Sequence, residues 1–519
     1  MSSAMRARQR TQPNRGRWSS RVLGALDGRL AALLALIATA LILWPINGVQ
    51  RDYDEGVYWQ SLRAMASGHP LFTSVFSSQP PFFLLSLYPF YMFFGQSIAA
   101  ARFGVAVFAV IGVIAMYWLG RELGGHWIGL AAAALLAIDP LFLHEARTLQ
   151  AEAPALALEI LCVALAVAAL RQRGRARAVL ALASGIVLAL GTLIKLLDVV
   201  AIVPIVLYLG APAFATWDAG DGRLRPPSTD ALRLALHESL AALAWVVVGV
   251  IVGSLVVLLP FVGSFGALWD QVVRFHLVAA RVEHASLLHN TKIIAGGMKT
   301  LGVPALLALL LAAWRRAWRM IPPLLWLGAS GLLLIRQAPL FDHHIVLVIP
   351  CLALTAALGL EMAPRPADTQ TRRALNIGFS AVLALALLVG AALGVRSARS
   401  DARGPSTDTA QAVAAITAFT APGQPIVTDD QYLAALADRS TPPELVDTSS
   451  VRITTKYLTA AQLEAILSRP DTRFVVLASG RLQNTPGFMP WLAANYSKLA
   501  DLGGGRAIYE RAPTSSPIA

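Results

Sequence analysis

Long apolar runs follow one another along most of this chain, and they constrain its fold more than any other feature. A helix needs roughly 17–25 mostly apolar residues to cross a lipid bilayer. Only 14% of the residues are charged and 56% are apolar, whereas about a quarter of an ordinary soluble domain is charged. The sequence therefore predicts a mainly α-helical, polytopic membrane protein of about eleven transmembrane helices. The predicted spans are 29–46, 101–119, 127–143, 153–170, 179–194, 196–211, 239–262, 300–314, 321–335, 345–361 and 374–395.

The distribution of arginine predicts how these spans are oriented, because short cytoplasmic loops are enriched in Lys and Arg. Residues 1–28 form an arginine-rich tail, and the connections 171–177, 315–319 and 365–373 are also rich in arginine. We therefore expect a cytoplasmic N-terminus in the plasma membrane, with residues 396–519 on the opposite, extracytoplasmic side. The net charge of +13 then reports orientation. No nucleic-acid-binding motif accompanies it, so a nucleic-acid partner is not expected.

The last 124 residues, 396–519, have the composition of a soluble domain. Helical and strand-like segments alternate there, which is typical of a small α/β domain. Such a domain would cover a site in the membrane part, 29–395, or would bind an acceptor. The expected helices are 409–419, 431–437 and 459–468, and the expected strands are 425–429, 474–477 and 507–509.

The first outer loop, 47–100, carries an acidic and aromatic cluster directly after the first span. Asp52, Asp54 and Glu55 occupy three of four consecutive positions, and a suitably placed carboxylate can accept a proton from a hydroxyl group. Aromatic side chains nearby offer apolar faces on which sugar rings can stack. A solvated loop is the alternative explanation. Later in the same loop, the apolar run 82–94 is too short to span and predicts an interfacial helix.

Three further polar groups lie at the ends of predicted spans, where ionisable side chains are costly unless they pair or bind something. Arg147 and Glu152 either pair with each other or bind a ligand. Lys195 either forms an ion pair with Asp198 or meets a lipid phosphate, for which a point charge is suitable. His343 and His344 follow Asp342, and adjacent histidines at a helix start are expected to point apart and not to share a metal ion.

Several of these motifs together resemble the polytopic glycosyltransferases of the GT-C superfold. The resemblance is strongest to the bacterial branch related to protein O-mannosyltransferases and aminoarabinose transferases (glycosyltransferase families 39 and 83). It implies a polyprenyl-phosphate-linked sugar as donor and transfer on the extracytoplasmic side. The residues that carry it are Asp54-Glu55-Gly56-Val57-Tyr58, Gly68, Pro80-Pro81, Phe94-Gly95 and Arg102.

The resemblance also implies roles for individual residues. Asp54 would be the catalytic base and Glu55 would orient the site. Lys195 and Arg147 would neutralise the donor phosphate, whose departure would invert the anomeric centre. Glu152 stands where the family usually has Asp. The remaining expected substrate-binding residues are Arg51, Tyr58, His69, Asp342, His343 and His344.

No cofactor is expected, although Asp52-Tyr53-Asp54 has the letters of an Asp-x-Asp motif and leaves a divalent ion open. The sequence leaves open the sugar, and also whether the acceptor is a lipid, a glycan or a protein. Two other functions compete with this hypothesis, namely an O-antigen-type ligase or polymerase and a secondary transporter. A transporter is expected to place its charges near the bilayer midplane on broken helices of repeated halves, which the sequence does not indicate.

Overall fold

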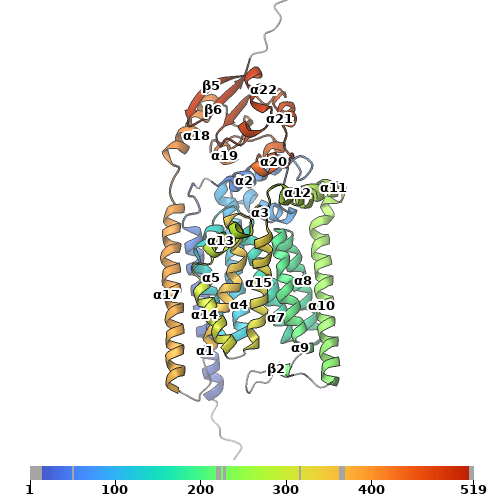
Figure 1. Ribbon diagram of the computed structural model, residues 1–519, viewed down its shortest axis with the longest axis vertical. Coiled ribbons are helices and arrows are strands. Elements are labelled where there is room, and N and C mark those ends of the chain that lie inside the picture. The colour runs from blue at the N-terminus through green and yellow to red at the C-terminus, as the bar shows by residue number, and fades with distance from the viewer. Residues whose placement is uncertain are drawn as a thin grey trace, which may run out of the picture.

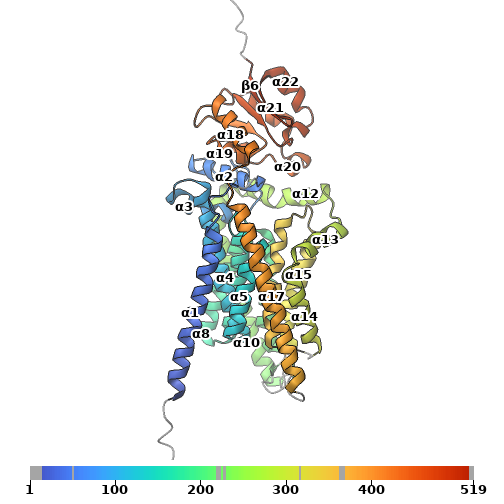
Figure 2. The same cartoon turned by 90° about the vertical axis from the view of Figure 1, so that its left-hand side faces the viewer.

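The computed structural model is a bundle of long helices with the C-terminal domain stacked on one end (Figure 1). It describes residues 15–49, 52–214, 216–217, 224–225, 229–314, 317–361 and 369–512. The first helix starts at the end of the bundle that lies away from this domain, as both views show (Figure 2). We call the end beneath the domain the capped end.

Each predicted span contains a helix. The central helix α7 (Glu152–Leu170) is buried over nearly its whole length, and α4, α8 and α9 pack around it. Its alternation of Ala with larger aliphatic residues lets neighbouring helices approach closely. The other bundle helices are α1 (Arg15–Leu43), α4 (Ile98–Gly124), α5 (His126–Ile138), α8 (Gly174–Thr192), α9 (Ile202–Phe214), α10 (Thr229–Leu258), α14 (Gly302–Trp314), α15 (Ile321–Arg336), α16 (Ile349–Leu358) and α17 (Thr369–Asp401).

Fewer helices than predicted are long and apolar enough to cross a membrane by themselves. Within the described ranges, six meet that criterion, and a seventh does so if two helices that meet at 94°, Leu287–Gly297 and Gly302–Trp314, form one span. Others are shortened, as where residues 196–211 divide into a 3₁₀ turn η1 (Leu196–Ala201) and α9. The mainly helical membrane architecture is thus confirmed, whereas the count of eleven stays a prediction. The six are Ile98–Gly124, Glu152–Leu170, Gly174–Thr192, Leu232–Val282, Asp342–Glu361 and Ala374–Asp401.

Short helices gather at the capped end (Figures 1 and 2). Among them, α3 (Pro81–Phe93) corresponds to the predicted interfacial helix. It buries Phe83 and Leu87 and leaves Phe93 85% exposed, which suits a helix that lies along an interface. The others are α2 (Tyr53–Ala66), α6 (Pro140–Glu145), η2 (Leu259–Ser264), α11 (Phe265–Trp269), the π-helical η3 (Asp270–Arg274), α12 (Phe275–Val282), α13 (Leu287–Gly297) and η5 (Asp342–Val348).

Away from the capped end, four short elements connect bundle helices. They are a two-residue antiparallel pair, β1 (Thr216–Trp217) with β2 (Leu224–Arg225), and the 3₁₀ turns η4 (Trp318–Met320) and η6 (Gly359–Glu361).

The C-terminal domain is built on a four-stranded sheet of order β3-β4-β6-β5. The pair β3–β4 is parallel and the other pairs are antiparallel. The strands are β3 (Ile426–Thr428), β4 (Phe474–Leu477), β5 (Tyr496–Gly503) and β6 (Arg506–Arg511). The helices are α18 (Thr407–Phe419), α19 (Gln431–Leu436), η7 (Pro443–Leu445), α20 (Ser450–Thr454), α21 (Ala460–Leu467), η8 (Leu482–Asn484) and α22 (Phe488–Asn495).

The predicted strands and helices of this domain are all confirmed, but one strand was not predicted. Strand β5 lies at the edge of the sheet and is mostly exposed, so it lacks the apolar pattern by which strands are recognised. The transition into the domain also differs from the prediction, because α17 continues past residue 395 and ends at Asp401.

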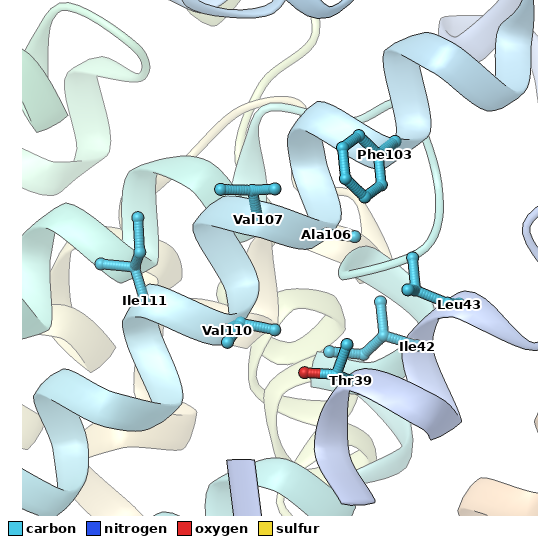
Figure 3. Close-up of a pocket in the computed structure, with 8 residues that line it drawn as sticks. All are labelled: Thr39, Ile42, Leu43, Phe103, Ala106, Val107, Val110 and Ile111. Atoms are coloured by element: carbon cyan, nitrogen blue, oxygen red, sulfur yellow. The ribbon is translucent and has the colours of Figure 1, made fainter. Parts of the chain in front are cut away.

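An apolar pocket of about 290 Å³ is lined by residues of α1 and α4 (Figure 3). The side chain of Phe103 borders it near the capped end, and the one hydroxyl in its wall, that of Thr39, donates to the Ala35 carbonyl. The pocket therefore offers a ligand only apolar contacts. Its wall consists of Thr39, Ile42, Leu43, Phe103, Ala106, Val107, Val110 and Ile111.

Glycines bring α8 and α10 into backbone contact. A Cβ atom on Gly249 would lie 2.1 Å from the Leu182 carbonyl oxygen, and one on Gly185 would lie 2.0 Å from the Val246 carbonyl oxygen. Close approach of this kind is how membrane helices gain packing energy.

Replacing Gly249 with Ala should therefore lower the midpoint of thermal unfolding in detergent. The added methyl group meets backbone that cannot rotate away, and such overpacking costs about 1–3 kcal/mol. Gly328→Ala in α15 is the matched control, because a Cβ there meets nothing within 4 Å. Equal midpoints for Gly249→Ala and the native protein would contradict this packing.

Candidate active site

Helix α2 begins the polar site at the capped end. Asp52 is its N-cap, accepting a hydrogen bond from the Glu55 amide at 3.0 Å and another from Gln150 Nε2 at 2.9 Å. Asp is favoured at the N-cap because its carboxylate oxygens accept hydrogen bonds from backbone amides that the first helical turn leaves unpaired. The cap places Asp54 in that first turn, where the helix dipole favours a negative charge.

Glu55 is fully buried in an ion pair with Arg102 from α4. Arg102 Nε and Nη2 donate to the two Glu55 carboxylate oxygens at 2.7 and 2.6 Å, and Nη1 donates to the Ile46 and Gly48 carbonyls. The Leu149 amide donates to Glu55 Oε1 at 2.5 Å. Glu55 thus ties α2 to α4 and to the second outer loop, and its orienting role stays a prediction.

A second polar group forms where α7, η1 and η5 meet. Lys195 Nζ pairs with Glu152 Oε1, and His343 Nε2 lies 3.4 Å from the same oxygen. Glu152 therefore pairs with Lys195 and not with Arg147. Among the described residues, Asp198 makes no ion pair with Lys195, although it follows one turn later. The Lys195 side chain extends toward α7 from an extended residue that precedes η1, so helical spacing does not apply.

The expectation that His343 and His344 point apart was wrong. Ligand atoms of Glu152, His343 and His344 all lie within 4.8 Å of one another, and the two imidazole rings touch edge to face at 4.5 Å. Both residues lie in the first turn of the tight 3₁₀ helix η5, whose geometry differs from the α-helix assumed. These three residues could hold a metal ion. A cation there would compete with Lys195 for the Glu152 carboxylate.

Asp54 belongs to a cluster of acids with Asp52, Glu145 and Glu152, which we call the acid cluster. Burial, followed by the charges of Asp52, Glu152 and Asp447, raises the pKa of Asp54 to about 8, and Lys195 opposes this rise. Burial likewise raises the pKa of Glu145 well above its usual value, with Glu152 contributing next. One Glu145 oxygen, Oε2, is buried and has no hydrogen-bond partner among the residues that the structure describes. Such mutual repulsion is typical of catalytic carboxylates.

The other predicted site residues lie in several places. Arg147 is 1% exposed; its Nε donates to the Leu143 carbonyl and its Nη1 lies 3.4 Å from Asp401 at the end of α17. Tyr58 is buried and packs edge to face on Phe83 at 4.8 Å. The structure therefore brings Asp54, Glu152, Lys195, His343 and His344 together, with Tyr58 in electrostatic reach of Asp54 and Glu152, but places Arg147 against other partners. His69 and Asp342 are exposed, and Arg51 lies outside the described residues.

The C-terminal domain contributes residues to this region that the sequence analysis missed. The Tyr53 hydroxyl donates to Asp447 Oδ1 at 3.0 Å, and Arg102 Nη2 donates to the Tyr432 hydroxyl at 3.4 Å. These partners are separated by more than 300 positions, and no motif links them. For the contact between Glu55 and Arg102, the sequence did contain a signal, because both residues belong to the set that carries the family resemblance.

The arrangement can support proton transfer beside an anion-binding group. A carboxyl with a pKa near neutrality is suited to general base catalysis, and an amino group in electrostatic reach of it can stabilise a phosphate. The polytopic helical bundle thus places this polar cluster at its capped end, beneath the C-terminal domain.

Known proteins with a similar sequence segment or a similar fold include membrane glycosyltransferases. A family model described as dolichyl-phosphate-mannose-protein mannosyltransferase matches residues 78–217. Among solved structures, ArnT from Cupriavidus metallidurans bound to undecaprenyl phosphate matches with a TM-score of 0.60 and 16% identity, over 95% of this chain and 98% of that chain. A search of curated protein sequences finds no match.

Two further structures share the fold. The archaeal oligosaccharyltransferase AglB from Archaeoglobus fulgidus, in complex with an inhibitory peptide and a dolichol-phosphate, matches with a TM-score of 0.55 and 14% identity, over 95% of this chain and 75% of that chain. The arabinofuranosyltransferase AftD from Mycobacteria gives a TM-score of 0.50 and 15% identity, over 94% of this chain and 40% of that chain. The resemblance to the GT-C glycosyltransferases is thus confirmed, and the chain has their fold.

Breaking the buried Glu55–Arg102 pair from one side should strongly destabilise the protein. In Arg102→Gln, Glu55 remains buried without its counter-charge, a defect that costs about 3–5 kcal/mol. The exposed Arg473–Glu510 pair provides the control, because loss of a surface pair costs at most about 1 kcal/mol. Thermal unfolding of Arg102→Gln and Arg473→Gln in detergent measures the difference. Similar midpoints for the two variants would contradict the assigned burial.

The raised pKa of Asp54 also predicts how stability depends on pH. Its ordinary value is 3.8 and its folded value is about 8, so the stability associated with the neutral carboxyl is complete below pH 3.8. It is lost as the pH rises toward 8. Asp54→Asn removes this loss, so its unfolding midpoint should exceed that of the native protein by an amount that grows from pH 5 to pH 8. The exposed Asp408→Asn should keep a constant offset, and parallel curves for Asp54→Asn would refute the assignment.

Proposed function

We propose that this protein transfers a sugar from a polyprenyl-phosphate donor to a hydroxyl group of an acceptor at the extracytoplasmic face of the membrane. The observation that carries the proposal is the position of Asp54. It lies at the start of α2 at the capped end, within electrostatic reach of Lys195 and Glu152. A candidate base and a candidate phosphate-binding cation therefore occupy one site in a chain with the GT-C fold.

In this mechanism, the acceptor oxygen attacks the anomeric carbon while the bond from that carbon to the phosphate oxygen breaks. Asp54 takes the proton of the acceptor hydroxyl, and polyprenyl phosphate leaves with the bonding electron pair. The attack comes from the side opposite the leaving group, so the anomeric centre is inverted. The amino group of Lys195 stabilises the charge that develops on the phosphate.

The contacts favour Lys195 over Arg147 for the phosphate. Among the described residues, Lys195 pairs with one carboxylate, that of Glu152. Its amino group has three donor hydrogens, so it can bind that carboxylate and a ligand at the same time. Arg147 is buried: its Nε donates to the Leu143 carbonyl and its Nη1 lies 3.4 Å from Asp401, while its two Nη groups make no hydrogen bond among the described residues. We therefore assign Lys195 to the donor phosphate and Arg147 to anchoring the end of α17.

The proposed orientation rests on the positions of basic residues. Helix α7 runs from Glu152 in the polar site to Leu170, so the arginine-rich connection that follows it lies away from the capped end. The start of α1 lies there too (Figure 1). Since basic loops remain on the cytoplasmic side, we place the capped end and the C-terminal domain outside.

Asp54→Asn should abolish most of the transfer. The purified full-length protein would be supplied with undecaprenyl-phosphate-linked hexoses and pentoses and with cell-envelope acceptors, and release of undecaprenyl phosphate would be followed. Loss of a general base lowers rates by about 10²–10⁴-fold. Asp408→Asn, which removes an exposed carboxylate of the C-terminal domain, should retain native activity.

Full transfer by Asp54→Asn would overturn the assigned base. If neither protein transfers sugar but the native protein moves a lipid-linked substrate across proteoliposomes, a transporter replaces this proposal. Transfer of a preassembled glycan chain, with no transfer of single sugars, would indicate a ligase.

A further inference from the structure

Helix α2 lies between the bundle and the C-terminal domain (Figures 1 and 2), and the domain holds it along its length. Gln60 Nε2 donates to the Arg439 carbonyl at 2.9 Å, and Arg63 Nη2 donates to Asp438 Oδ1 at 2.9 Å. A Cβ atom on Gly56 would lie 2.4 Å from the Tyr432 amide nitrogen. The two backbones thus touch, and α2 is in contact with the domain from its first turn to its last.

The contact nearest Asp54 is made by the residue before it. The Tyr53 hydroxyl donates to Asp447 Oδ1 at 3.0 Å and accepts from the Thr448 amide at 2.7 Å. The guanidinium of Arg481 lies over the Tyr53 ring, 3.9 Å from its centroid. Asp447 is itself fixed, because the Ser449 amide donates to its Oδ1 at 2.7 Å. The C-terminal domain therefore supplies the partners of both the hydroxyl group and the ring of Tyr53.

We propose that the C-terminal domain is a working part of the transfer site, in which Asp447 acts through Tyr53 as a positioning residue for Asp54. The inference rests on the proposed function, since it takes Asp54 as the base. Glu55 is pinned on the bundle side by Arg102, and Tyr53 is pinned on the domain side. Asp54 lies between two neighbours that are held from opposite sides, so its orientation depends on both.

The charge of Asp447 reaches Asp54 as well. The ionisable groups that act on Asp54 come from the N-cap of α2 (Asp52), the start of α7 (Glu152), the residue before η1 (Lys195) and the C-terminal domain (Asp447). The negative charge of Asp447 raises the pKa of Asp54. The domain thereby influences both where the base points and the pH at which it ionises.

The hydroxyl group of Tyr53 can be removed alone. Tyr53→Phe in the full-length protein should lower kcat about 5- to 10-fold, the equivalent of roughly one hydrogen bond, and leave KM for the donor unchanged. Tyr457→Phe is the matched control, because it removes another hydroxyl between the C-terminal domain and the capped end, bonded to Asp270 Oδ1 at 3.2 Å. Tyr457→Phe should retain native kcat.

Two substitutions separate the position of Asp447 from its charge. Asp447→Asn keeps an oxygen that accepts from Tyr53 and Ser449, so kcat at high pH should be close to native. Because the negative charge is gone, the rising limb of the pH profile of kcat/KM should shift to lower pH. Asp447→Ala removes the acceptor and should lower kcat as Tyr53→Phe does.

Amide hydrogen exchange of α2 provides a readout that does not need activity. The amides of its first turn should exchange about 5- to 10-fold faster in Tyr53→Phe than in the native protein, and Tyr457→Phe should leave them unchanged. Equal exchange and equal kcat in the two variants, or an unshifted pH profile in Asp447→Asn, would overturn the inference while Asp54→Asn stays inactive. Absence of transfer by the native protein would instead refute the proposed function.

Discussion

The buried ion pair between Glu55 and Arg102 fixes the geometry on which the site depends. Both side chains are fully buried, and their desolvation is costly unless every remaining donor and acceptor is satisfied. The protein meets this condition with carbonyls from the junction of the first span and the first outer loop, an amide from the second loop and the Tyr432 hydroxyl. An apolar pair of similar size could stabilise the bundle as well, but it would not specify one arrangement of four segments.

That arrangement explains why the residue beside Glu55 can be a half-buried acid. Asp54 has no counter-ion of its own within the described ranges, and its nearest charged neighbours include three carboxylates. A free loop would relieve this repulsion by moving the carboxyl group into solvent. Here the N-cap at Asp52, the pair at Glu55 and the contact at Tyr53 hold the first turn of α2 in place. These neighbouring contacts therefore offset the unfavourable repulsion within the acid cluster, a trade of stability for function that is common at functional sites.

Much of the helical architecture could be predicted from the sequence because a bilayer imposes one pattern. Apolar runs locate the helices, and the confirmed elements of the C-terminal domain follow the same logic of buried periodicity. Strand β5 was missed because an edge strand buries little. Ion-pair partners that are distant in the sequence were harder to predict. Helical spacing suggested Asp198 as the partner of Lys195, but the backbone of Lys195 is extended, so this spacing does not apply. Arg147 pairs with Asp401, which lies at the end of a helix that continues past its predicted end.

The candidate site could be predicted only in part for a related reason. Asp54, Glu152 and Lys195 stood out because charge is scarce in this chain, and the structure places them in one region. Tyr53, Tyr432 and Asp447 carried no such signal, since aromatic residues and acids are ordinary in a soluble domain. Their importance comes from contact with α2, which only the fold creates. A base whose pKa lies near neutrality binds its proton more strongly than an ordinary aspartate, so it accepts the proton of an alcohol more readily once ionised. The same acids that make Asp54 costly to bury therefore make it a stronger base, and the domain that supplies one of them, Asp447, also holds the helix on which Asp54 lies.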